Sequence, residues 1–310
     1  MPPALKVTLR TTIFLLFTLS CLPIQATENI NTQFLKKTIV YLYRGDTMGH
    51  PDPGLPLGTG FLVRVPLLTD PTRSYVVLVT ARHMVDPAWS HCPDAQPQVI
   101  YVRYNKKVYD PAKDESGIDY FRLDLVQNGV PTWSHPTEED ADVAIFQLNG
   151  KAVQDNVDGG EIPISDFATD DEAKLRATTD PVLSVGLLPA YPGVKRNYPF
   201  WKFGQISDKP DESVPVPCVK DGGTTLLRLW FLSINLVPGN SGSPIFYAPE
   251  GSNGVSFGGG RATLIGLQSI SFLGSDVSGM TPVQYIFEAI QNLKLQDADF
   301  YRGLPQNKPK

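Results

Sequence analysis

The chain has 310 residues, of which 42% are hydrophobic and 19% charged, so it can bury a sizeable core in one large or two small domains. Its formal net charge of −5, without a basic patch, argues against a nucleic-acid binder held by phosphate contacts. The 28 prolines and 26 glycines follow no period, which excludes collagen and coiled coil and indicates many short strands joined by turns.

The N-terminus has the composition of an export signal. Lys6 and Arg10 form a positive region, and the apolar run 13–19 follows. We therefore predict that residues 1–26 are a signal peptide cleaved after Ala26, and that the mature protein is exported, either periplasmic or secreted.

Two other readings of this segment remain open. Cys21 could carry a lipid, or the segment could stay uncleaved as an anchor. The apolar run is too short to cross a bilayer comfortably, so we expect no stable membrane span in the mature chain.

Segments rich in β-branched and aromatic residues predict strands along most of the chain. In the first half they are 34–43, 58–63, 74–80, 98–104, 119–126 and 143–148. In the second half they are 182–188, 202–206, 226–232, 244–247 and 262–270.

The remaining segments predict connections and one long helix. Residues 45–57, with three prolines, predict a loop, and the acidic stretch 155–180 predicts the link between the halves, with a short helix at 170–176. The glycine-rich stretch 251–260 predicts a hairpin tip. Apolar residues share one face of 282–295, which predicts a C-terminal helix before a tail at 301–310. The pattern is typical of an all-β protein built as a pair of barrels or sandwiches.

Ser241 lies at the centre of the turn 237–244, with Gly239 and Gly242 on either side. Glycines allow a close approach of the backbone to a ligand, and a serine on such a turn can be a nucleophile if a base activates it.

His83 is the best candidate for that base. It follows the strong strand 74–80, and a strand end is a rigid place from which to present a side chain. Asp142 directly precedes the apolar strand 143–148, so it can be partly buried and can orient the imidazole. Each residue alone is more often structural, but together they supply the base and acid that a nucleophilic serine needs.

Three motifs in the order His, Asp, Ser resemble those of chymotrypsin-like (trypsin-like) serine proteases. They are Thr80-Ala81-Arg82-His83, Asp142-Val143-Ala144-Ile145 and Gly239-Asn240-Ser241-Gly242-Ser243-Pro244. The resemblance covers roughly residues 34–295, and the GNSGSP letters are similar to bacterial exported members of the family.

The resemblance implies a fold and an architecture. We expect an all-β chain with two six-stranded β-barrels and a C-terminal α-helix. The peptidase domain would span 27–300, with the first barrel at about 34–150 and the second barrel plus helix at 180–295.

The resemblance also implies a serine endopeptidase that acts on proteins or peptides without a cofactor or metal. Ser241 would be the nucleophile, His83 the base and Asp142 the orienting acid, and the backbone N–H groups of Gly239 and Ser241 would form the oxyanion hole. Asn240 stands where digestive members have the aspartate that pairs with a new N-terminus, so activation of that kind is not expected.

For the specificity pocket, the resemblance places Asn235 near its base and Ser269 and Ser271 on its wall. No acidic residue stands at the base, and Gln268 stands where glutamyl endopeptidases have a histidine. We therefore expect a small or medium uncharged side chain at the cleavage site rather than a basic or acidic one.

Cys92 and Cys218 are the cysteines left after the predicted signal. They could form a disulfide or stay as separate thiols, because their separation cannot be read from sequence. No Cys/His spacing predicts a metal site.

Two other functions remain open from the residues alone. One is a catalytically silent, protease-like binding protein, in which the long segments 86–137 and 150–180 cover the cleft. The other is an esterase on the same fold. The oligomeric state is not indicated.

Overall fold

The computed structural model describes residues 32–46, 48–90, 97–113, 115–217, 223–247, 262–272 and 274–300. The predicted signal peptide, the hairpin tip at 251–260, the tail at 301–310, and both Cys92 and Cys218 lie outside the described residues.

The first half of the chain forms a curved antiparallel sheet in the order β5-β4-β1-β2-β3-β8. Its strands are β1 (Ile39–Gly45), β2 (Pro51–Pro66), β3 (Ser74–Thr80), β4 (Val99–Asn105), β5 (Ile118–Asp124) and β8 (Ala144–Leu148). The short β9 (Ile162–Pro163) adds to β2 in parallel.

The second half closes into a barrel in the order β10-β11-β14-β17-β16-β15. Its strands are β10 (Pro181–Gly186), β11 (Phe200–Asp208), β14 (Trp230–Ser233), β15 (Pro244–Tyr247), β16 (Thr263–Ser271) and β17 (Val277–Pro282). Two hairpins stand apart from these sheets: β6 (Val126–Gln127) with β7 (Val130–Pro131), and β12 (Val214–Pro217) with β13 (Thr224–Leu227).

Both halves have the same strand order. If the main strands of each half are numbered along the chain, the second barrel closes as 1-2-3-6-5-4-1, and the first sheet runs 5-4-1-2-3-6. The first sheet is therefore the same barrel with one pairing missing, between β5 and β8. The all-β, two-barrel prediction of the chymotrypsin-like type is confirmed, except that the first barrel is open.

The opening has a local cause. Ser134 lies on the outer edge of β8, where its N–H and C=O exchange 2.9 Å hydrogen bonds with Ile145. The chain between β5 and β8 thus occupies the edge that β5 would need to close the barrel.

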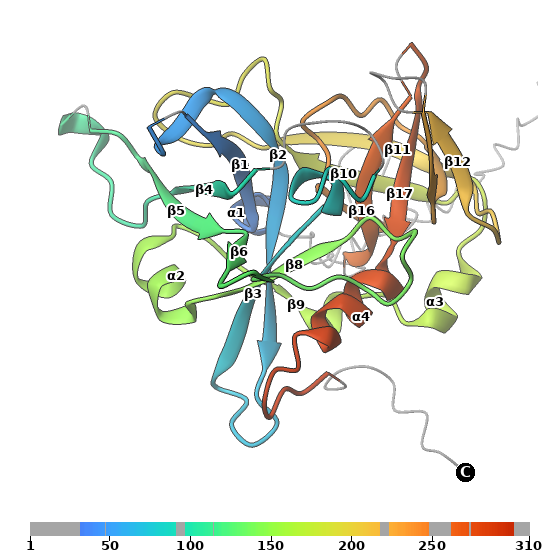
Figure 1. The fold of residues 1–310 in the computed structure, drawn as a ribbon, viewed down its shortest axis with the longest axis horizontal. Helices are drawn as coiled ribbons and strands as arrows, with labels where there is room; N and C mark the ends of the chain where they lie inside the picture. The colour runs from blue at the N-terminus through green and yellow to red at the C-terminus, as the bar shows by residue number, and fades with distance from the viewer. Residues whose placement is uncertain are drawn as a thin grey trace, which may run out of the picture.

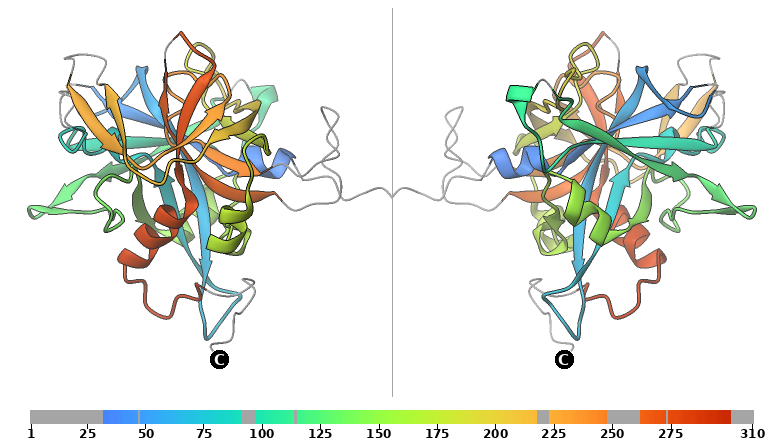
Figure 2. Two further views of the ribbon diagram at one scale, coloured as in Figure 1. Left: turned by 90° about the vertical axis from the view of Figure 1, so that its right-hand side faces the viewer. Right: turned by 90° about the vertical axis from the view of Figure 1, so that its left-hand side faces the viewer.

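The two halves share one apolar core. A continuous cluster of buried side chains runs from Leu35 to Ile290, through both sheets. Helix α4 (Val283–Asn292) contacts β8 of the first half and β16 and β17 of the second, and Figure 1 shows it (red) between the β2–β3 hairpin and α3 (Asp170–Leu175). The β2–β3 hairpin projects beyond the sheet, as the side views of Figure 2 show. The two halves are thus packed together and not joined only by the linking segment.

Three predicted elements were wrong in detail. Residues 34–37 belong to helix α1 (Thr32–Lys37) and not to the first strand. The predicted proline-rich loop at 45–57 is largely strand, because β2 begins at Pro51 and proline is tolerated where a strand need not donate an N–H. The predicted strand 226–232 is two strands, β13 and β14, with Arg228 between them donating its N–H to Asp140 O at 2.9 Å.

The connecting segments contain two further helices, α2 (Gly150–Asn156) and α3 (Asp170–Leu175). The acidic link predicted α3 well. Its start is fixed by a capping box, in which Thr169 and Glu172 exchange side-chain to backbone hydrogen bonds. Short 3-10 helices lie at Arg82–Met84, Pro111–Lys113 and Ile164–Asp166.

Candidate active site

The pairing of β3 with β8 brings His83 and Asp142 together. The two strands are antiparallel, with Thr80 opposite Ala144, so the end of β3 and the start of β8 meet at one edge of the sheet. His83 lies in the 3-10 helix just after β3, and Asp142 lies two residues before β8. Sequence-distant residues therefore become neighbours through strand pairing alone.

The Asp142 carboxylate binds His83 at two points. Its Oδ2 lies 2.8 Å from His83 Nδ1, and its Oδ1 accepts a 2.9 Å hydrogen bond from the His83 backbone N–H. Asp142 is 1% exposed, whereas the His83 side chain is 32% exposed. The carboxylate is thus fixed in the interior, and it holds Nδ1 so that the other ring nitrogen, Nε2, is left for solvent or substrate.

The charge balance at this pair raises the pKa of His83. Burial of the imidazole lowers its pKa, but the charge and the hydrogen bond of Asp142 raise it, and the net result lies above the ordinary value of 6.5. The imidazole is mostly neutral, and so able to accept a proton, only at a pH above its own raised pKa.

Ser241 follows a turn whose shape requires glycine. Asn240 N–H donates to Val237 O at 2.9 Å, with Pro238 and Gly239 between them, and Gly239 has φ of +96°. Proline followed by a residue of positive φ is the pattern of a type II turn. A side chain at Gly239 would also collide with Pro189, since its Cβ would lie 2.2 Å from the ring.

The turn that carries Ser241 packs against the segment that carries His83. Gly242, next to Ser241, has φ of +82°, and a Cβ there would lie 2.1 Å from Thr59 O and 3.1 Å from the Met84 methyl. Met84 directly follows His83 in the chain. The structure therefore brings all three predicted triad residues to the junction of the two halves.

Three hydrogen-bonding groups of the Ser241 turn are unused within the described part of the chain. The Ser241 hydroxyl has no hydrogen-bond partner there, and neither Gly239 N–H nor Ser241 N–H donates to a described residue. Catalytic hydrogen bonds are often absent or long until substrate binds. The arrangement supplies a free hydroxyl beside two free backbone donors.

Asn240 fixes the turn from below with both ends of its amide. Its Oδ1 accepts a 2.9 Å hydrogen bond from Val237 N–H, and its Nδ2 donates to Leu187 O at 2.6 Å. Asn240 is 2% exposed. A neutral side chain here satisfies one donor and one acceptor, which a carboxylate could not do.

The predicted specificity residues lie near the turn but do not form one contact cluster. Asn235 is exposed and approaches Asp276 at 3.5 Å, while its carbonyl accepts from Lys202 Nζ at 2.7 Å. Ser269 is buried, with its hydroxyl 2.6 Å from that of Thr281.

Ser271, the second predicted wall residue, belongs to the same strand as Gln268. Its Oγ accepts from Gln268 Nε2 at 3.1 Å. Gln268 is 1% exposed, and its Oε1 has no hydrogen-bond partner among the described residues. Its backbone also clasps the serine segment, because its O accepts from Gly242 N–H and its N–H donates to Ser243 O. Gln268 therefore joins the site, though the sequence signalled it only through the resemblance.

Arg82 is a second residue whose role the sequence did not reveal. It is 7% exposed, and its guanidinium bonds Glu139 at 3.0 Å and Asp86 at 3.4 Å while lying 4.8 Å from the centre of the Trp89 ring. These contacts support the short helix that carries His83.

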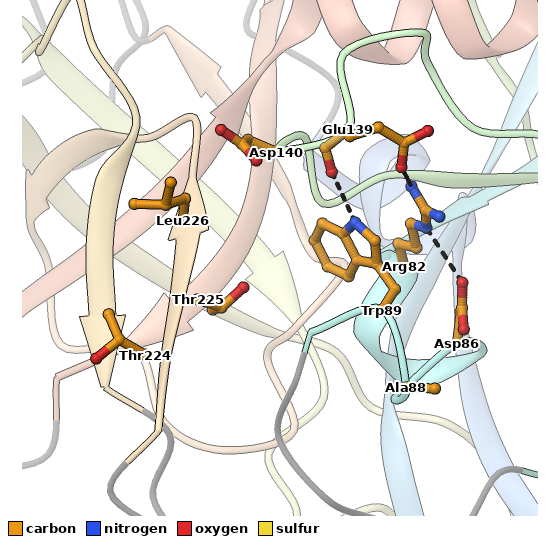
Figure 3. A pocket seen from close by; sticks show the side chains of 9 residues that line it. All are labelled: Arg82, Asp86, Ala88, Trp89, Glu139, Asp140, Thr224, Thr225 and Leu226. Atoms are coloured by element: carbon orange, nitrogen blue, oxygen red, sulfur yellow. Dashed lines mark hydrogen bonds and ion pairs between the residues drawn. The ribbon is translucent and has the colours of Figure 1, made fainter.

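Beside this cluster lies a pocket of about 710 Å³. Figure 3 shows its two walls, with Trp89 and Arg82 on one side and residues 224–226 of β13 on the other. The pocket is lined by residues from both halves of the chain, and three of its lining residues carry carboxylates.

Neither a metal site nor a membrane-spanning helix is found among the described residues. No cluster of three or more His, Cys, Asp or Glu side chains there could hold a metal ion. No described helix combines the length and apolar character needed to cross a bilayer.

No family model matches the sequence, and no curated protein matches it. Among solved structures, the MamO protease domain from Magnetospirillum magneticum in its apo form is similar at 15% identity and a TM-score of 0.47, over 85% of this chain and 98% of that one. The active form of the Rv3671c protease from M. tuberculosis is similar at 13% identity and a TM-score of 0.45, over 93% of each chain. The fold and site described above rest on this chain's own strand order and contacts.

The pKa of His83 gives the first test. Its imidazole should titrate with a midpoint above pH 6.5, so the protonated pair stabilises the folded state below pH 6.5, and this contribution is lost as the pH rises through the midpoint. In Asp142→Asn only burial remains, so the midpoint should fall below 6.5. NMR titration of the histidine ring signals measures both values, and an unchanged midpoint in the variant would contradict the assigned cause.

Asn240→Asp tests the fixing of the turn. The carboxylate cannot donate to Leu187 O, and burying it should lower the free energy of unfolding by about 1–3 kcal/mol at pH 7. Once protonated, the new carboxyl group can donate again, so the loss should shrink as the pH falls towards about 4.

Asn292→Asp is the matched control. Asn292 is exposed and also donates its Nδ2 to a backbone carbonyl, that of His135 at 2.8 Å. Water can hydrate the new carboxylate there, so urea unfolding should show a smaller loss. Equal losses in the two variants would show that the buried amide has no special role.

Proposed function

We propose that this protein is a serine endopeptidase that cleaves peptide bonds through His83, Asp142 and Ser241. The observation that carries the proposal is the buried Asp142 carboxylate, which binds both the backbone N–H and Nδ1 of His83. A carboxylate held in this way fixes the ring tautomer and stabilises the imidazolium that forms when the ring takes a proton.

The proposed reaction has two stages, acylation of Ser241 and hydrolysis of the acyl-enzyme. Ser241 Oγ bonds to the scissile carbonyl carbon while its proton moves to His83 Nε2, and the carbonyl oxygen becomes an oxyanion. When that intermediate collapses, the C–N bond breaks and His83 returns the proton to the leaving amine. Water then hydrolyses the acyl-enzyme by the same route, again with His83 as base.

The two free N–H groups, on Gly239 and Ser241, would receive the oxyanion. Donors of this kind act where negative charge develops, and removal of one oxyanion-hole donor from a serine protease lowers kcat by about 10²–10³-fold. Because Gly239 needs its positive φ and close packing on Pro189, the donor geometry is built into the turn.

Proteins or peptides are the proposed substrates. The specificity assignment of Asn235, Ser269 and Ser271 remains part of this proposal, and an uncharged side chain at the cleavage site is proposed because none of the three carries a charge.

Labelling with a fluorophosphonate probe tests the nucleophile. Ser241 Oγ should bond to phosphorus with loss of fluoride, while His83 takes the serine proton. Ser241→Ala should abolish labelling, and His83→Ala should slow it by about 10²-fold or more.

Ser243→Ala is the matched control. Ser243 lies two residues from Ser241, is fully buried, and its hydroxyl has no hydrogen-bond partner among the described residues. This variant should label as the parent chain does. Persistent labelling of Ser241→Ala would sink the assignment, and a parent chain that neither labels nor cleaves a peptide library would favour the silent binding protein.

We also propose that the protein is exported, on the composition of residues 1–26 alone. Expression of the full chain in a bacterial host with a secretory pathway should yield a product that begins at Thr27. N-terminal sequencing of the extracytoplasmic fraction checks this, and a cytoplasmic product that retains residues 1–26 would refute it.

A further inference from the structure

Thr59 of β2 is the residue of the first half that touches the serine turn most directly. It is completely buried and opposite Tyr41 of β1. Its backbone N–H donates to Ser241 O at 2.9 Å, and its hydroxyl donates to Gly239 O, also at 2.9 Å. One residue thus holds the carbonyls of both residues whose N–H groups would form the oxyanion hole.

The hydroxyl of Thr59 is itself oriented by its surroundings. Leu187 N–H donates to it at 3.0 Å, which leaves the hydroxyl proton for Gly239 O. The carbonyl of the same Leu187 accepts from Asn240 Nδ2 at 2.6 Å. Thr59, Leu187 and the pair Gly239–Asn240 therefore form a closed ring of neutral hydrogen bonds.

This ring holds the turn at a glycine, in addition to the turn hydrogen bond from Asn240 N–H to Val237 O. Glycine has no side chain to restrict its dihedral angles, and Gly239 already occupies the positive-φ region. Gly239 O shares its peptide plane with Asn240 N–H, and Ser241 O shares its plane with Gly242 N–H. The plane that carries Ser241 N–H lies between these two held planes, and the plane that carries Gly239 N–H directly precedes the first. The two contacts of Thr59 therefore limit how both donors can turn.

The strand that carries Thr59 is held as well. Thr80 Oγ1, at the end of β3, donates to Thr59 O at 2.8 Å. Since β3 leads directly into the His83 helix, Thr59 is linked on one side to the base and on the other to the nucleophile.

We propose that Thr59 is a positioning residue for the oxyanion hole. Its hydroxyl holds Gly239 O, and its backbone N–H holds Ser241 O. The inference rests on the proposed serine hydrolase chemistry. Thr59 does not touch the substrate, and it acts through the orientation of the Gly239 and Ser241 N–H groups.

Thr59→Val keeps the shape of the side chain and removes the hydroxyl. Its reaction with a fluorophosphonate probe should show a maximal rate constant, kinact, at least about tenfold lower, because the oxyanion donors are no longer aligned. The probe concentration for half-maximal rate, KI, should stay unchanged. Thr59→Ser restores the hydroxyl and should restore most of kinact.

Thr38→Val is the matched control for lost stability. Thr38 is also fully buried and donates its hydroxyl to a backbone carbonyl, Leu35 O at 2.8 Å, away from the turn. It should lower Tm while leaving kinact as in the parent chain. If Thr59→Val does not fold, Thr59→Cys gives the same test, because the thiol fills similar space but is a weak donor.

A second readout is independent of activity. In an isotope-labelled sample, the amide signals of Gly239 and Ser241 should shift or broaden in Thr59→Val and return in Thr59→Ser. Unchanged amide signals, or an unchanged kinact in folded Thr59→Val, overturn the inference. A parent chain that fails to label while these amides still respond to Thr59→Val overturns the proposed function alone.

Discussion

The candidate site depends on the docking of the two halves, because neither half contains all of it. His83 and Asp142 come from the open sheet, and Ser241 comes from the closed barrel. The shared apolar core and helix α4 hold the halves together over a wide area. The hydrogen bonds of Thr59 then fix their relative position at the point where chemistry would occur.

Within this frame, burial is distributed unequally among the groups that would react. Asp142 is almost fully enclosed and His83 is partly open, while the Ser241 hydroxyl is free of partners in the described chain. An enclosed carboxylate has a fixed geometry and a strong effect on its neighbour, because little water screens it. The open side of the imidazole is the side from which a substrate can approach.

The sequence predicted the parts of the molecule that depend on local chemistry. Strand ends marked by His83 and Asp142, and the glycines around Ser241, could be read directly, since strand propensity and positive φ are local properties. The open edge at β8 could not be read, because it depends on where Ser134 folds back. Thr59 and Arg82 were missed as supporting residues, and Gln268 was noted only through the resemblance, because each of the three has at least one partner far away in the chain.

The ring beneath Ser241 is made of amides, carbonyls and a hydroxyl, and the groups that clasp the other side of the turn, from Gln268, are also uncharged. Dissolved ions weaken attraction between charges but have little effect on buried hydrogen bonds between neutral groups. The turn that carries Ser241 should therefore keep its shape across wide changes of ionic strength, whereas a change of pH acts on the site through the His83–Asp142 pair.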